Sequence, residues 1–485
     1  MRGLPRRVVA AAGCVVAMLL AAGVSATAAT PAQPDAVAID RFLAAGLDAT
    51  GLPGMAVAVT HGADVVHIAG YGTDGRGRPV TPRTPFRIGS LTKSFTAAAV
   101  LQLVEAERVD LDAAVQTYLP GFTTSDAALS QRITVRQLLN QTSGISDTGF
   151  AAVTDTEPDL ARRVAGLREA GLVSEPGTAF HYSDLNYQVL ARLIEVVSGA
   201  PWGVVLRQRV FAPLGMGDTV AAATAGEATE AVPGLAPGHV LVFGMPVDRP
   251  ELDGLLAGSG GVVSTAEDMA RWLRAQATGA VPMLSPASVA LMQTPPSDVV
   301  GRYGMGWQVV SPQEGPRRIE HNGILSTFSA DQVLLPDSGY GFALLYDANS
   351  ALADTAGLKV GLAELLVGDA SAGGPRSTSV VAGGLGAATL AVLALRVRLL
   401  LRIPCWRRRW AGRRRWTAVP GLVWLVLPVG LLAAMPALMR LVAGRSFTFW
   451  QLCLAMPDPV ILLAVAGLTG TAVAAVRLVA LVRPD

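Results

Sequence analysis

The composition of the chain changes sharply after residue 378, where three apolar stretches follow one another toward the C-terminus. They cover residues 379–395, 418–439 and 459–481, and each is near the length of about 20 residues that a helix needs to cross a bilayer. Nine arginines and no acidic residue lie between the first two stretches, which by the positive-inside rule predicts a cytoplasmic loop. We therefore expect residues 379–485 to form a membrane region with three transmembrane helices in the lipid bilayer.

The N-terminal residues indicate that the chain is exported. Residues 2–7 contain three arginines, residues 8–24 are apolar, and Ala26-Thr27-Ala28 has the small-x-small pattern of a cleavage site. This predicts a secretory signal peptide over residues 1–28. Cys14 suggests a lipid anchor as an alternative, but the apolar run continues well past it. The large region between the two ends is then expected outside the cytoplasm.

The exported region is acidic, although the whole chain has a formal net charge of +2. Residues 29–378 hold 23 Lys and Arg against 35 Asp and Glu, a net charge of −12. No basic surface is therefore expected there for nucleic acid. Nucleic-acid binding is an alternative for the arginine-rich loop, but its place between two membrane stretches favours the topological explanation. All three cysteines lie in the signal or membrane regions, so the exported domain has no disulfide.

Lysine occurs only twice in the chain, at Lys93 and Lys359, against 37 arginines. An ammonium can lose its proton and a guanidinium cannot, so a retained lysine is a candidate base. Lys93 follows Ser90 by three residues, at the start of a segment (90–107) that predicts a buried helix. Residues three apart on a helix have Cβ atoms about 5 to 6 Å apart, close enough for proton transfer from a hydroxyl to an amine. The alternative is an ordinary N-cap serine and a solvated lysine.

The rest of the exported region predicts an α+β fold. Strand patterns at residues 55–60 and 63–70 begin it, and four more follow late, at residues 306–310, 318–321, 328–335 and 341–346. The middle is mostly helical, with patterns at residues 90–107, 111–119, 135–141 and 185–198. Strands at both ends imply one antiparallel sheet completed late in the chain, with a helical region beside it. We place the domain at residues 29–367 and a small-residue linker at residues 368–378.

Two other segments concentrate polar side chains. Residues 180–187 (FHYSDLNY) precede an amphipathic helix, where Ser183 or Asp184 makes an ordinary N-cap. Beside an activated serine, the hydroxyl of Tyr182 is instead a candidate proton relay. Residues 319–323 (IEHNG) predict a strand end with a turn. G-x-S-x-G and H-E-x-x-H are absent and the five histidines show no ligand spacing, so we expect neither a metal nor a cofactor.

Taken together, these residues form a known order of motifs. S-x-x-K at Ser90, Y-S-D at Tyr182 and H-x-G at His321 resemble the serine β-lactamase and penicillin-binding-protein superfamily, specifically its class C β-lactamase-related group. Segments 133–145 (ITVRQLLNQTSGI), 258–273 (GSGGVVSTAEDMARWL) and 303–307 (YGMGW) also resemble that group. The resemblance runs from about Ala36 to Leu366. It implies the β-lactamase/transpeptidase-like fold, an antiparallel sheet flanked by helices plus a helical region.

The resemblance assigns roles position by position. Ser90 is the acylated nucleophile, Lys93 its activating base, and Tyr182 the group that passes a proton to the leaving group. The oxyanion hole is formed by the backbone N–H groups of Ser90 and Ile324, and such donors are each worth about 3 to 4 kcal/mol. The implied substrate-binding positions are Asp184, His321, Asn322, Gly323 and Ile324.

Two positions depart from the family pattern. Asp184 stands where the second motif usually has asparagine, which adds a negative charge that tends to keep Lys93 protonated. Ile324-Leu325 follows the third motif where small residues are usual, and bulky side chains there narrow the substrate groove. Acyl transfer remains expected, but hydrolysis of β-lactams does not, because deacylation depends on fine positioning of water.

The sequence therefore predicts a multi-pass protein of a bacterial cell membrane whose extracytoplasmic domain is a serine hydrolase. Its substrate is expected to be a small molecule or short peptide with an ester or amide bond, such as a D-amino-acid peptide. Two alternatives stay open, a D-alanyl-D-alanine carboxypeptidase and a non-hydrolytic sensor that binds cell-wall fragments or penicillin. The sequence does not indicate an oligomeric state.

Overall fold

A computed structural model describes residues 35–147, 157–279, 283–299, 301–369, 372–410, 419–443 and 448–482, so the predicted signal peptide lies outside the described residues. In this part of the chain, six antiparallel strands form the central sheet in the order β2-β1-β11-β10-β9-β8. The strands are β1 (Gly54–His61), β2 (Asp64–Gly72), β8 (Gln308–Val310), β9 (Arg318–Ile324), β10 (Ser329–Leu335) and β11 (Tyr340–Tyr346). The early hairpin pairs with the last long strand, as the sequence predicts.

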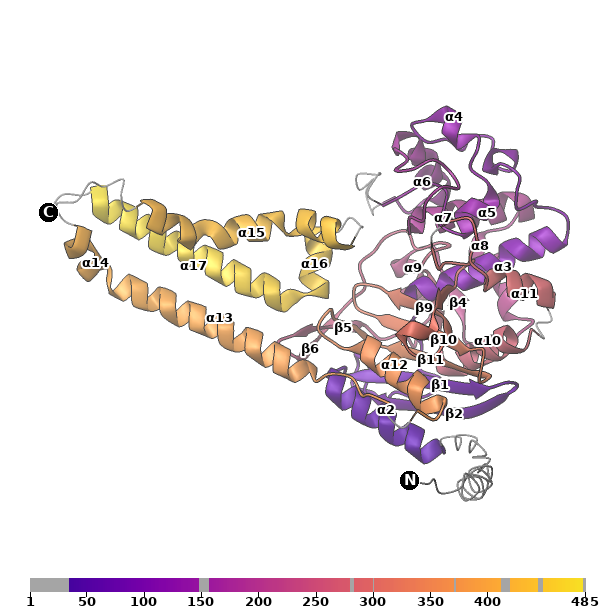
Figure 1. Cartoon of the computed structure of the whole chain (residues 1–485), viewed down its shortest axis with the longest axis horizontal. Helices are drawn as coiled ribbons and strands as arrows, with labels where there is room; N and C mark the ends of the chain where they lie inside the picture. Colours follow the sequence, from indigo (N-terminus) through magenta and orange to yellow (C-terminus); the bar gives the residue numbers. More distant parts are fainter. Residues whose placement is uncertain are drawn as a thin grey trace, which may run out of the picture.

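Helices cover both faces of this sheet (Figure 1). α2 (Ala36–Thr50) and α12 (Thr355–Leu366) pack on one face, and α3 (Thr92–Glu105) and α10 (Ala266–Thr278) pack on the other. Alternate residues of β1 enter the two resulting cores, so nearly the whole strand is buried. This double burial explains why β1 is an almost continuous apolar run instead of an alternating one.

The helical region lies on the α3 side of the sheet, whereas β5 (Gly238–Val242) and β6 (Met245–Arg249) lie near the start of α13 (Thr378–Leu401) (Figure 1). One small sheet joins β3 (Phe86–Arg87), β7 (Val262–Ser264) and β4 (Val220–Ala221); a second joins β12 (Ala348–Asn349), β5 and β6. The region's helices are α4 (Ala127–Ser130), α5 (Val135–Leu139), α6 (Leu160–Gly166), α7 (Asp184–Ser198), α8 (Trp202–Leu206), α9 (Ala225–Ala231) and α11 (Pro286–Met292).

The predicted helix over residues 111–119 is wrong. The structure has only a 3₁₀ turn there, Val115–Thr117. The backbone N–H of Val115 donates to the carbonyl of Ile133, and Ala114 forms a bridge with Thr134, so this segment makes its hydrogen bonds with a neighbouring segment. Tertiary pairing therefore replaces the local helix that the apolar pattern favoured.

The C-terminal part is all helical in its described residues. Its helices are α13 (Thr378–Leu401), α14 (Ile403–Trp410), α15 (Val419–Ala443), α16 (Phe449–Ala455) and α17 (Pro457–Val482). Among the described residues, three helices are long and apolar enough to cross a membrane: Thr378–Leu401, Gly421–Val442 and Pro457–Leu481. These agree with the three predicted stretches, although the first extends past residue 395 and includes Arg396 and Arg398.

The C-terminal helices contact the domain that holds the central sheet directly. The backbone N–H of Phe243, in the β5–β6 turn, donates to the carboxylate of Asp458 at 2.8 Å, and that of Ala351 donates to the carbonyl of Ala455 at 2.9 Å. The segment predicted as a tether also lies along the domain, since the N–H of Arg376 donates to Asp354 at 2.8 Å. The domain is thus docked on the helices through a β-turn as well as linked to them by the chain.

Candidate active site

Ser90 lies in the 3₁₀ turn Gly89–Leu91, which leads directly into α3. The helix itself begins at Thr92, so Ser90 precedes it and is not its first residue. Gly89 has a φ of +52°, and a Cβ there would lie 2.9 Å from the backbone nitrogen of Ile324. Only glycine lets β9 approach the serine turn this closely. Ser90 is half-buried, so its hydroxyl is open to a substrate on one side.

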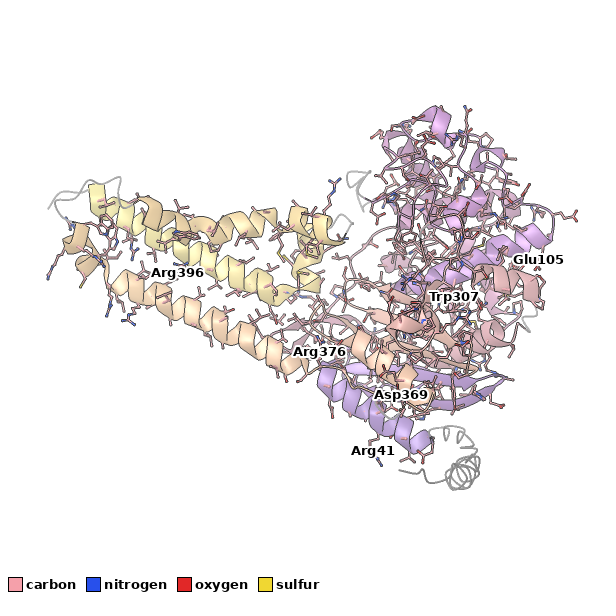
Figure 2. All side chains as sticks on the ribbon, in the orientation of Figure 1. Arg41, Glu105, Trp307, Asp369, Arg376 and Arg396 are labelled. Atoms are coloured by element: carbon pink, nitrogen blue, oxygen red, sulfur yellow. The ribbon has the colours of Figure 1, made fainter. Side chains whose placement is uncertain are left out.

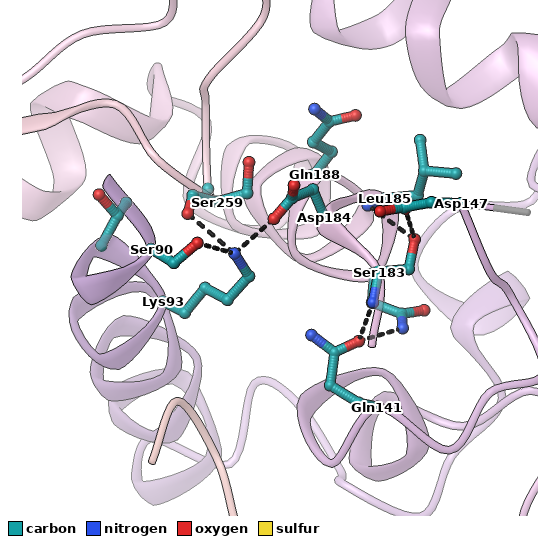
Figure 3. Close-up of polar contacts among 12 residues, drawn as sticks. Ser90, Lys93, Gln141, Asp147, Ser183, Asp184, Leu185, Gln188 and Ser259 are labelled. Carbon is teal, nitrogen blue, oxygen red and sulfur yellow. Dashed lines mark hydrogen bonds and ion pairs between the residues drawn. The ribbon is translucent and has the colours of Figure 1, made fainter. Parts of the chain in front are cut away.

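Lys93 is fully buried beneath the serine and its ammonium has three acceptors (Figure 3). Nζ donates to Ser90 Oγ at 2.9 Å, to Asp184 Oδ1 at 2.5 Å and to the carbonyl oxygen of Ser259 at 3.0 Å. The Tyr182 side chain also hydrogen-bonds this ammonium. The predicted contact between a serine hydroxyl and a lysine three residues later is therefore present in the structure.

The charge of Lys93 is set by its neighbours. Burial alone lowers the pKa of this amine, but the Asp184 carboxylate and the Tyr182 side chain together outweigh burial, so its pKa is raised above the ordinary value. Asp184 is the first residue of α7, and its side chain is 37% exposed, so one side of the ion pair faces solvent. Asp184 thus bonds directly to Lys93, whereas the resemblance assigns it to substrate binding.

Tyr182 and Tyr303 complete the wall beside the lysine. Lys93 Nζ lies 4.9 Å from the centroid of the Tyr182 ring and 5.7 Å from that of Tyr187, distances at which a cation is attracted to an aromatic face. The rings of Tyr182 and Tyr303 pack edge to face, with centroids 5.8 Å apart. The structure therefore brings Tyr182 to the Ser90 and Lys93 pair, from a segment about 90 residues further along the chain.

His321 faces the same site from β9 but its nitrogens are already bonded. Nδ1 lies 2.7 Å from the carbonyl oxygen of Asn322, which only accepts, so Nδ1 carries the proton. Nε2 then accepts from the hydroxyl of Tyr303 at 2.9 Å. Burial, with help from the positive charge of Lys93, lowers the pKa of His321 to about 3, so the ring is neutral. It supports the tyrosine wall and offers no free nitrogen to a substrate.

The remaining predicted positions follow His321 along β9. A Cβ at Gly323 would lie 2.0 Å from the carbonyl oxygen of Ile88, so this glycine is required by the same close approach as Gly89. Asn322 and Ile324 point to the other side of the strand and are exposed, Ile324 by 59%. The backbones that carry the N–H groups of Ser90 and Ile324 are adjacent, as an oxyanion hole requires.

Sequence reasoning missed three contributors. The carbonyl of Ser259 acts through its backbone, so no side-chain motif marks it; the only signal is the glycine-rich turn, in which Gly258 has a φ of +77°. Tyr303 belongs to the YGMGW segment, which supports the resemblance without giving this tyrosine a role. Gln141 accepts from the N–H of Ser183 at 3.0 Å and from the side-chain amide of Asn186, which fixes the start of α7.

The arrangement places a serine hydroxyl, a lysine ammonium and a carboxylate in hydrogen-bonded contact. Among the described residues, no group of three or more His, Cys, Asp or Glu side chains is placed to hold a metal ion. The chemistry that these side chains support is therefore acyl transfer to a serine hydroxyl, with the ion pair as the proton store.

Comparison with known proteins agrees with this chemistry. The family model described as Beta-lactamase matches residues 39–365. The chain belongs to the beta-lactamase family. This beta-lactamase-family chain is 31% identical over 318 residues to Penicillin-binding protein 4 of Amycolatopsis lactamdurans, covering 62% of this chain and 82% of that one.

A hydrolase and a solved structure are also similar to this family member. It is 29% identical over 331 residues to Unguisins hydrolase ungD' of Aspergillus campestris, covering 63% of this chain and 60% of that one. In structure it is similar to the octameric penicillin-binding protein homologue from Pyrococcus abyssi, with a TM-score of 0.61, 25% identity and coverage of 69% and 78%. The predicted superfamily, its α+β fold and the serine hydrolase class are confirmed.

Proposed function

We propose that the chain is a membrane-anchored serine hydrolase that cleaves ester or amide bonds outside the cytoplasm, through an acyl-enzyme at Ser90. The observation that carries this proposal is the position of Lys93 Nζ, 2.9 Å from the serine oxygen and 2.5 Å from Asp184. The three long apolar helices support the anchoring. The arginine-rich loop after the first of them supports the orientation.

The proton path follows from the raised pKa of Lys93. Since the amine is protonated at neutral pH, it must first release a proton to solvent, and the Asp184 carboxylate in contact with it opposes that release. The neutral amine then takes the proton of Ser90 as Oγ attacks the carbonyl carbon. As the carbon–leaving-group bond breaks, Tyr182 donates its hydroxyl proton to the leaving group and takes a proton back from the Lys93 ammonium. A water molecule then gives a proton to the neutral amine as its oxygen attacks the acyl carbon, and that proton returns to Ser90 Oγ as the acid leaves.

The charges of the site favour substrates without a carboxylate near the cleaved bond. Lys93 is paired with Asp184, and His321 is neutral with both nitrogens bonded, so neither basic side chain is available to bind a second carboxylate. β-Lactams and peptides that end in a D-amino acid both carry such a carboxylate. We therefore propose neutral esters or amides as the substrate class, ahead of D-alanyl-D-alanine.

A non-hydrolytic binder is the second candidate. The observation that favours it is the raised pKa of Lys93. If Lys93 stays protonated, it cannot take the proton of Ser90, so acylation of Ser90 and hydrolysis of the acyl-enzyme are both slow. In that case a bound acyl group is held as a long-lived adduct at Ser90.

A fluorophosphonate probe and a chromogenic ester separate the two candidates. We expect labelling of the full-length protein that is lost in Ser90→Ala, together with repeated turnover of p-nitrophenyl esters. Stable labelling by fluorescent penicillin without ester turnover would instead support the binder. Labelling of intact cells by a membrane-impermeant fluorophosphonate tests the orientation, and its absence with normal labelling after lysis would place the domain in the cytoplasm.

A further inference from the structure

Three helices converge where α13 and α17 end, far from the catalytic domain (Figure 1). Arg396 of α13 lies against α17, with its Nη2 atom 3.5 Å from the position of a Cβ on Gly470 (Figure 2). The guanidinium of Arg477, on α17, lies over the ring of Trp406 in α14, 5.1 Å from its centroid. Two guanidinium groups and an indole from three separate helices thus meet at one end of the bundle.

Hydrogen bonding at this place is incomplete. The Nε atoms of Arg396 and Arg477 are both buried, and neither has a hydrogen-bond partner in the described structure. A buried donor without an acceptor is costly, and more so when the group is charged. These two N–H groups therefore require an acceptor that is not among the described residues.

The described helices hold no acid that serves this purpose. From residue 372 onward the only described acidic residue is Asp458, which lies at the other end of α17 and accepts from Phe243. The 19 residues between Asp458 and Arg477 correspond to about 28 Å of helix. More cations stand at the arginine end, namely Arg398, Arg402, Arg408 and Arg409, all of them exposed. The counter-charge must therefore come from outside these helices.

The lining identifies the chemistry of the missing acceptor. Guanidinium groups bind phosphate through paired N–H donors. Tryptophan is enriched at the level of lipid headgroups, and Trp406 and Trp410 stand on α14 with ring centroids 6.1 Å apart. Basic pockets between transmembrane helices on the cytoplasmic side bind anionic headgroups. Arg396 and Arg477 are both partly exposed, so their guanidinium groups are open to a phosphate from outside the protein.

We propose that an anionic phospholipid binds between the ends of α13 and α17, with its headgroup phosphate accepting hydrogen bonds from Arg396 and Arg477. Trp406 forms the wall of the site against the glycerol region. This inference rests on the proposed membrane location of the three helices, and it adds a specific ligand to them. It also gives the three spans a role beyond anchoring, because the bound lipid joins α13 to α17.

Native mass spectrometry of the full-length protein tests the site. The protein is released from dodecyl maltoside micelles that contain equal amounts of phosphatidylglycerol and phosphatidylcholine. We expect one phosphatidylglycerol to be retained at collision energies that remove phosphatidylcholine. The double variant Arg396→Gln and Arg477→Gln is expected to lower this retention about twentyfold, because each arginine near the headgroups contributes about fivefold in affinity. The double variant Arg398→Gln and Arg402→Gln, which alters two exposed arginines of the same helix end, is expected to retain the lipid as the wild type does.

Several outcomes overturn the inference. Equal retention of the two lipids by the wild type removes the headgroup specificity, and an equal loss in both double variants reduces the effect to general charge. Displacement of phosphatidylglycerol by millimolar inorganic phosphate would assign the site to free phosphate. Fluorophosphonate labelling of Ser90 in the same samples keeps the two proposals apart: normal labelling without lipid retention defeats this inference alone, and lipid retention without labelling defeats the hydrolase alone.

Discussion

The two lysines of the chain occupy opposite sides of the central sheet and make a natural comparison. Lys93 lies on the α3 side, where it contacts Ser90 and Asp184. Lys359, in α12, lies on the other side, 2.9 Å from Glu320 and 3.3 Å from Asp331. Lys93 is fully buried and the side chain of Lys359 is 12% exposed, and acidic partners raise the pKa of both amines against the effect of burial.

What separates the two sites is the surroundings of the ion pair. The carboxylates that hold Lys359 have side chains only 9% and 7% exposed, and Glu320 is also bound by Arg318. That network is closed, and the polar partners of Lys359 among the described residues are both carboxylates. At Lys93 the partner Asp184 is 37% exposed and a serine hydroxyl lies beside the amine. Each scarce lysine therefore marks an ion pair, and the neighbouring hydroxyl and the open carboxylate distinguish the Lys93 pair, for which we propose the catalytic role.

Replacement of each lysine by arginine should give the largest difference in acylation rate between the two sites. Lys93→Arg keeps the positive charge but removes the proton that the mechanism transfers, so we expect acylation to fall by about 10² to 10⁴. Lys359→Arg keeps the charge of a structural pair and should leave the rate within about twofold. The measurement is the second-order rate constant for fluorophosphonate labelling of the two variants. Unchanged labelling of Lys93→Arg would exclude Lys93 as the base.

Removal of the partly exposed carboxylate of Asp184 should shift the pH dependence of kcat/KM. The charge of Asp184 raises the pKa of Lys93, so Asp184→Asn lowers that pKa and increases the fraction of neutral amine at a given pH. The rising limb of kcat/KM for a p-nitrophenyl ester should shift to lower pH, and the rate at pH 7 should increase roughly tenfold for each pKa unit gained. Asp331→Asn, on the opposite side of the sheet, is the control and should leave the limb in place. A rate that falls at every pH would mean that Asp184 is needed as the proton acceptor.

The closed network should matter for stability and not for catalysis. Lys359→Met leaves Glu320 and Asp331 facing each other without their shared cation, and loss of one partner of a buried pair costs about 3 kcal/mol. Urea unfolding of the full-length protein in detergent, followed by tryptophan fluorescence, measures this loss. Ester turnover per folded molecule is expected to stay at the wild-type value, and a fall in turnover would contradict the division between the two sites.

The two lysine sites also show how far the sequence leads. Three-residue spacing at the start of a helix is local geometry, so the contact between Ser90 and Lys93 was predictable, and so were the long apolar helices. The direct bond of Asp184 to Lys93 joins residues 91 positions apart, and spacing carries no such information. The Ser259 carbonyl was hidden for another reason, because every residue has a backbone carbonyl. Its role appears only once the glycine-rich turn is folded against α3.

The wrong helix and the bonding of His321 have physical causes of the same kind. Residues 111–119 have a helical apolar pattern, but their backbone groups pair with the segment around Ile133. The family resemblance assigns His321 to substrate binding, yet its nitrogens are bonded within the protein. In both cases the sequence shows which hydrogen-bonding groups are present. It does not show their partners in the fold, and those partners decide what each group can still bind.

Removal of one tyrosine hydroxyl on each side of the sheet should give the smallest effects on activity and stability. Tyr303→Phe removes the donor to His321 Nε2 and leaves a buried acceptor without a partner, which costs about 1 kcal/mol and should lower kcat/KM about fivefold. Tyr346→Phe is the matched change on the Lys359 side, where the buried hydroxyl has no hydrogen-bond partner in the described structure. Its loss should leave activity unchanged and stability equal or slightly higher, since an unpaired polar group is removed. Ester kinetics and urea unfolding of both variants check this pair. An equal loss of activity in the two would mean that the sheet transmits packing changes to Ser90 from either side, and the separation of the two lysine sites would then be wrong.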